Sequence, residues 1–271
     1  MCFPEICNHM VTKRSFSIEA RNLECDIVFH PGTLITYMLM SNISTLLVAF
    51  ALAAWDGTID SARFFISVSF SRDPSRAVAS FGMAFMALWT ASVYGLKYLE
   101  IYRNRESRVC RAFANAAVFL GMSSCVLGIA TAAVSLDTHI NFHLILAAGM
   151  FTTSLLSMLF FCLLDRRHEL EEGRSPTSAS TSPEEGQVRT NDRMIGLRRI
   201  FFVICASAAI ILGLTFHRDS FVGSVSELVV FASFCLFMAT FASDLQDLHL
   251  RLSIVPNSYS EKTAKRQSKV L

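Results

Sequence analysis

Six apolar stretches, separated by polar and charged residues, dominate the pattern of this chain. Each is close to the roughly 20 residues that a helix needs to cross the hydrocarbon core of a bilayer. Backbone groups in lipid must be hydrogen-bonded within their own segment, and the stretches are too long and too evenly apolar for barrel strands. The pattern therefore predicts an all-α, polytopic membrane protein, a six-transmembrane-helix bundle. The predicted spans are residues 34–54, 77–99, 112–134, 142–164, 200–216 and 225–242.

Composition supports the membrane class and excludes others. Hydrophobic residues make up 52% of the 271 residues, charged residues only 17%, and the mean hydropathy is +0.44. The net charge of +2 gives no support for nucleic-acid binding. The short signatures of nucleotide, metal and hydrolase sites are absent from the sequence, so we expect no cofactor and no metal, and an enzyme is the less favoured class.

The basic residues predict the orientation of the spans. With the amino terminus in the cytoplasm, all but four of the 24 lysine and arginine residues lie on the cytoplasmic side. The four on the other side are Arg63, Arg72, Arg76 and Arg218. Because basic residues in short loops are retained on the cytoplasmic side, this distribution predicts that both termini are cytoplasmic. The expected organisation is a cytoplasmic segment 1–33, a membrane domain 34–255 and a cytoplasmic tail 256–271.

The cytoplasmic segments differ in character. Residues 168–192 are rich in Ser, Thr, Pro and charge, which predicts a flexible loop with Ser175 and Ser182 as candidate phosphorylation sites and a solvated spacer as the simpler reading. The tail is basic and suits contact with anionic lipid. We expect membrane lipid and protein partners to meet the loop or the tail, while the oligomeric state stays open. Residues 243–255 carry leucine and valine at helical spacing, which predicts an amphipathic segment on the inner membrane surface.

Four polar residues lie inside or beside the predicted spans, where each needs a partner. For Asn42 and Asn115 we favour an interhelical hydrogen bond. His143 begins the fourth span beside an exoplasmic turn, so it is a candidate proton sensor, although an ordinary interfacial histidine is the preferred interpretation. Glu227 is predicted to lie in the first turn of the sixth helix, where its carboxylate reaches water and the positive end of the helix dipole.

Several short motifs resemble one family of membrane proteins. The last span opens with Glu227 and closes on "TFASDLQDLHLRLS", the second exits through "YGLKYLEIYR", and the third contains "LGMSSCVLGIATAA". The stretch "HLILAAGMF" places His143 four residues before Ala147. In these motifs the chain resembles the damage-regulated autophagy modulator (DRAM) family, within the wider Frag/DRAM/Sfk superfamily. Leu228 and Leu245 replace the aromatic residues that are usual in the last span.

The resemblance implies a non-enzymatic regulator of autophagy in lysosomal or other endomembranes. It supplies no catalytic residues. The superfamily also offers two alternatives, a lipid or glycosylphosphatidylinositol-anchor (GPI-anchor) remodelling factor, expected in the Golgi, and a phosphoinositide-kinase adaptor, expected at the plasma membrane. A channel or transporter is less favoured, because charged residues inside the spans are sparse.

Overall fold

The fold is described from a computed structural model. It covers residues 25–29, 31–59, 64–104, 107–134, 136, 139–172, 185–215, 221–245 and 250–254. The candidate phosphorylation sites Ser175 and Ser182 and the basic tail 256–271 lie outside the described residues.

The described chain is helical apart from two short strands, which confirms the predicted fold class. Six helices are long and apolar enough to cross a membrane. In chain order the elements are β1 (Cys25–Phe29), α1 (Pro31–Trp55), α2 (Ile66–Ser69), α3 (Ser75–Asn104), α4 (Arg108–Ala133), α5 (Ile140–Glu172), α6 (Glu185–Thr215), α7 (Phe221–Ala239), α8 (Phe241–Asp244) and β2 (Leu250–Ile254).

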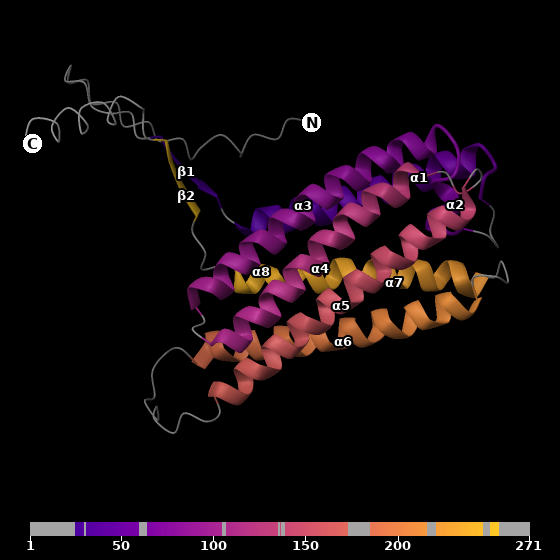
Figure 1. The fold of residues 1–271 in the computed structure, drawn as a ribbon. Coiled ribbons are helices and arrows are strands. Elements are labelled where there is room, and N and C mark those ends of the chain that lie inside the picture. Colours follow the sequence, from indigo (N-terminus) through magenta and orange to yellow (C-terminus); the bar gives the residue numbers. More distant parts are fainter. Residues whose placement is uncertain are drawn as a thin grey trace, which may run out of the picture. The chain divides into compact units, whose positions relative to one another are not determined.

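The six long helices pack mainly against their neighbours in sequence (Figure 1). α1 packs on α3, α3 on α4, α4 on α5, α5 on α6 and α6 on α7, and contacts between α7 and α1 close the bundle. α7 is the most central of the six long helices. Half of its most apolar 18-residue stretch is buried, whereas the corresponding share in the other five is 17% to 28%. Large apolar side chains such as Leu47, Phe119 and Ile210 face outward, as a lipid-exposed surface requires.

The short helices lie at opposite ends of the bundle (Figure 1). α2 belongs to the connection between α1 and α3 and contacts α1 and α7, whereas α8 follows α7 and contacts α1, α3, α6 and α7. We call the α8 end cytoplasmic and the α2 end exoplasmic, following the orientation predicted from the basic residues. At the exoplasmic end of α1, Gly57 has a positive φ of 72°, the left-handed conformation that commonly follows a helix.

The helices are longer than the apolar runs that predicted them. α3 has 30 residues, about 45 Å at 1.5 Å per residue, which exceeds the roughly 30 Å of the hydrocarbon core. α5 continues to Glu172 and α6 begins at Glu185, so both extend into the range 168–192 for which the composition predicts a loop.

The segment after α8 differs from the expected amphipathic helix. α8 ends at Asp244, and residues 250–254 form β2, which pairs with β1 in a two-stranded sheet. The amphipathic helix predicted for residues 243–255 is therefore wrong. The strand β2 pairs with a segment more than 200 residues away, and such a pairing leaves no local signal in the sequence. The helices lie in one compact unit, Phe29–Leu250, and most of the sheet belongs to a second unit.

Small residues and aromatic rings share the core of the bundle. The buried face of α4 is Cys110, Ala114, Ala117, Gly121, Ser124, Gly128 and Ala132, at spacings of three and four residues. Close helix packing in lipid depends on such small side chains. The Tyr94 ring lies against Gly121 and stacks on Phe161, with ring centroids 6.0 Å apart. Phe161 in turn meets Phe241 edge to face at 4.9 Å, so the core is continuous down to α8.

Candidate functional site

A cavity of about 130 Å³ lies inside the exoplasmic half of the bundle. All six long helices and α2 contribute to its wall, which is largely apolar. Three of the four polar residues singled out in the sequence line it, namely Asn42 from α1, His143 from α5 and Glu227 from α7. We refer to this space as the Glu227 cavity.

Glu227 is buried within the bundle, so the expectation that its carboxylate reaches water is wrong. It is the seventh residue of α7, about 9 Å along the helix, and its exposed fraction is 7%. Its Oε2 accepts a hydrogen bond of 2.6 Å from the backbone N–H of Ile66, and Oε1 accepts one of 3.3 Å from that of Ser67. These donors begin α2, so the carboxylate fastens the exoplasmic connection to the central helix.

Asn42 and His143 are also buried, with exposed fractions of 1% and 3%. Asn42 makes the expected interhelical hydrogen bond, from Nδ2 to the Cys235 sulfur at 3.1 Å. Nδ1 of His143 lies 2.9 Å from the carbonyl oxygen of Val134. Because a carbonyl only accepts, Nδ1 donates this hydrogen bond, and in the tautomer with its proton on Nδ1 the other nitrogen, Nε2, is an acceptor.

Polar atoms without a partner gather on the wall of the cavity. Among the described residues, five buried side-chain atoms have no hydrogen-bond partner, and three of them belong to residues of this wall: Asn42 Oδ1, Ser67 Oγ and His143 Nε2. Unpaired buried polar atoms are rare in proteins and call for an explanation. The described wall contains no lysine or arginine. The cavity therefore suits a small polar group attached to an apolar body.

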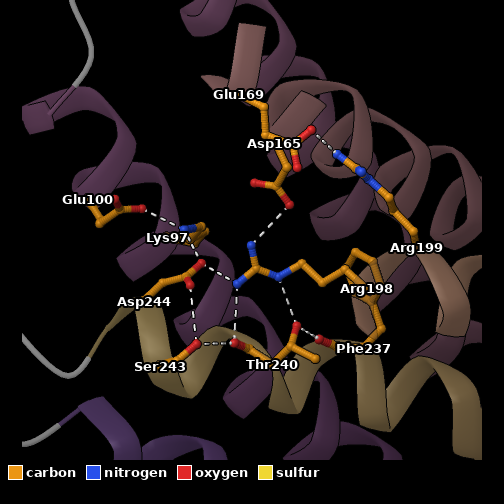
Figure 2. Close-up of polar contacts among 10 residues, drawn as sticks. All are labelled: Lys97, Glu100, Asp165, Glu169, Arg198, Arg199, Phe237, Thr240, Ser243 and Asp244. Carbon is orange, nitrogen blue, oxygen red and sulfur yellow. Dashed lines mark hydrogen bonds and ion pairs between the residues drawn. The ribbon is translucent and has the colours of Figure 1, made fainter. Parts of the chain in front are cut away.

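A second polar cluster, formed at the cytoplasmic end, joins four helices (Figure 2). It consists of Lys97 and Glu100 from α3, Asp165 from α5, Arg198 from α6 and Asp244 from α8, and we call it the charge clasp. Asp244 Oδ2 lies 2.5 Å from Lys97 Nζ and also pairs with Arg198. Lys97 pairs with Glu100 at 2.7 Å, and Arg198 Nη1 pairs with Asp165 at 3.0 Å.

Arg198 is the centre of the charge clasp. Its exposed fraction is 1%, and besides the two carboxylates it donates from Nε to Thr240 Oγ1 at 2.9 Å and from Nη2 to the Thr240 carbonyl at 3.2 Å. Its guanidinium carbon also lies 4.8 Å from the centroid of the Phe241 ring, and Lys97 Nζ lies 5.6 Å from the same centroid. Four hydrogen bonds and the contact with the Phe241 ring therefore surround this buried cation, which offsets its cost of desolvation.

Three of the four residues selected from the sequence line the Glu227 cavity, and the fourth, Asn115, belongs to neither cluster. Asn115 is exposed on α4 and lies outside the wall of the cavity, so the interhelical hydrogen bond expected for it does not form among the described residues. The sequence reasoning missed the charge clasp, because Lys97 and Arg198 were read only as cytoplasmic markers. Their signal was position: each lies within a membrane-spanning helix, where an unpaired charge is costly.

Most of the chain matches a known protein family. The model described as "Frag1/DRAM/Sfk1/Cwh43P N-terminal domain" matches residues 32–248, which include all six long helices and both polar clusters. Searches of curated proteins and of solved structures gave no match. A match over this much of the chain shows the family, and the protein belongs to the Frag1/DRAM/Sfk1/Cwh43P N-terminal domain family.

Proposed function

We propose that this protein is a non-enzymatic membrane regulator of autophagy, of the DRAM type, acting in lysosomal or other endomembranes. Family membership supports a multi-pass membrane protein of this superfamily, and the motifs of the second, third and last spans favour its DRAM branch. We infer that its protein partners bind the cytoplasmic loop within residues 168–192 or the tail 256–271.

The proposal that the protein is not an enzyme rests on the hydrogen bonds and ion pairs of its buried polar residues. Among the described residues of the cavity wall Glu227 is the only carboxylate, and two backbone N–H groups engage it. In the described part of the chain His143 Nε2 has no hydrogen-bond partner, so no nucleophilic side chain is seen hydrogen-bonded to it. Each charge of the clasp is paired with at least one group of opposite charge. Side chains engaged in this way hold a fold together and bind, and Glu227 is held by backbone donors rather than by a catalytic partner.

The test is complementation of cells that lack the protein. We expect a tagged copy to reach lysosomes and to restore autophagic flux, measured as the lysosome-dependent turnover of an autophagosome marker. A copy without residues 173–184 should reach the same membrane at the same abundance and fail to restore flux, because the partner segment is missing. A matched control replaces residues 173–184 by a Gly/Ser linker of equal length, which separates loss of sequence from loss of length.

A second function, GPI-anchor or lipid remodelling, is favoured by one observation: a carboxylate and a histidine line a cavity within the membrane domain. It predicts Golgi localisation, normal flux in cells lacking the protein, and an altered lipid composition of GPI-anchored proteins. A Glu227→Gln copy of normal abundance that fails to restore that composition would establish the remodelling function and contradict the regulator. Plasma-membrane localisation would instead favour the phosphoinositide-kinase adaptor.

A further inference from the structure

The Glu227 cavity has the size of a small ligand group rather than of a whole lipid. Its volume is about 130 Å³. A cavity of roughly 150 Å³ in another protein holds one benzene-sized molecule. The space therefore accommodates one ring or a few methylene groups together with a polar end, and the rest of a longer molecule would have to lie outside it.

The wall selects the chemistry of that polar end. Asn42 Oδ1 and His143 Nε2 are acceptors, the carboxylate of Glu227 is an acceptor, and Ser67 Oγ both donates and accepts. A phosphate only accepts and would need cations that the described wall does not have. An ammonium only donates, so it could not accept a hydrogen bond from the Ser67 hydroxyl. A hydroxyl group gives a hydrogen bond and takes one, so it matches this set best.

The rest of the wall suits an apolar body. Met83, Met86 and Met150 line the cavity, with aromatic rings from α5 and α7. Methionine side chains are flexible and polarisable, so they adapt to ligands of irregular shape. If water alone filled the cavity, most of the apolar surface of this wall would be hydrated, which is unfavourable in free energy.

We propose that the Glu227 cavity binds the hydroxyl end of a neutral, hydroxyl-bearing lipid, of the sterol or diacylglycerol class. The hydroxyl donates to Asn42 or His143 and accepts from Ser67, and the first rings or methylene groups pack on the methionines. The site is independent of the autophagy role, since it is defined by the wall of the cavity and by no partner.

The test uses the purified full chain in nanodiscs and two photoactivatable, alkyne-tagged probes, a sterol and a diacylglycerol. Each is compared with its own methyl ether, which has the same body and no donor. We expect the free hydroxyl form of one probe to label the protein about tenfold more strongly than its ether, as the loss of one hydrogen bond to a buried acceptor implies. Whichever of the two probes, sterol or diacylglycerol, labels the protein identifies the lipid class.

Asn42→Leu should reduce that labelling about tenfold, because it removes an acceptor without changing the size of the side chain much. Asn115→Leu is the matched control and should label like the natural chain, since Asn115 is exposed on α4 outside the cavity. Should Asn42→Leu fail to fold, mass spectrometry of the labelled natural chain decides: the adduct must lie on residues of the cavity wall.

Three results would overturn the proposal. They are equal labelling by a probe and its methyl ether, adducts confined to the outer surface of the helices, and labelling by a long-chain amine but by neither hydroxyl probe. None of them bears on autophagic flux in cells, so a failure here is distinguishable from a failure of the proposed function.

Discussion

At the scale of single residues, Arg198 and Arg199 are adjacent in sequence and opposite in environment. Arg198 is buried in the charge clasp, bonded to carboxylates from α5 and α8. Arg199 forms an ion pair with Glu169 at 2.6 Å, in which the two side chains are 42% and 40% exposed. Exposed pairs contribute little to stability, whereas removing one member of a buried network leaves charges without compensation. Substituting each arginine in turn therefore compares the stability contributed by a buried ion pair with that of an exposed one.

Arg198→Met should lower the free energy of unfolding by about 3–5 kcal/mol, because Asp165 loses its ion-pair partner and Asp244 keeps, among the described residues, the Lys97 ammonium alone. Arg199→Met should cost no more than about 1 kcal/mol. SDS-induced unfolding in mixed micelles measures both. Equal effects of the two substitutions would show that the clasp does not hold α5, α6 and α8 together.

At the scale of elements, close contact between α3 and α4 depends on a missing side chain. A Cβ at Gly121 would lie 2.3 Å from Cζ of Tyr94, far inside van der Waals contact. The tyrosine ring is fully buried and stacks on Phe161, so it has little room to move. Gly95, one residue after Tyr94 on α3, has no atom within 4 Å of its added Cβ.

Gly121→Ala should therefore destabilise the bundle by about 1–3 kcal/mol, the usual cost of overpacking. Gly95→Ala adds the same methyl group to open space and should be neutral or slightly stabilising, since alanine favours the helix. Thermal unfolding in detergent compares the two variants. A Gly121→Ala protein of unchanged stability would mean that α3 and α4 can move apart at no cost in free energy. That result would contradict the need for close packing at Gly121.

The elements also show what the sequence could and could not predict. The spans were predictable because hydropathy alone decides whether a segment of that length prefers lipid. α2 and β2 were not, since a four-residue helix fastened by Glu227 and a strand paired with β1 depend on contacts between distant segments. For the same reason Asn42, His143 and Glu227 could be selected as polar residues in lipid, while their meeting in one cavity could not be foreseen.

At the scale of the whole molecule, the two polar clusters lie at opposite halves of one bundle. The cavity is walled by residues near α2, and the clasp surrounds α8, with α7 running between them. With the predicted orientation, the cavity belongs to the exoplasmic half of the membrane and the clasp to the cytoplasmic half. Orientation therefore decides which leaflet supplies a lipid to the cavity and which compartment meets the clasp.

The orientation is testable with epitope tags before Met1, after Leu271 and within residues 173–184. We expect antibodies to reach all three tags once the plasma membrane alone is permeabilised, because six spans bring both ends to one side and the basic residues retain that side in the cytoplasm. A tag in the connection after Gly57 should stay protected until organelle membranes are opened. If the terminal tags were protected and the Gly57 tag accessible, the bundle would be inverted, and the Glu227 cavity would draw its lipid from the cytoplasmic leaflet.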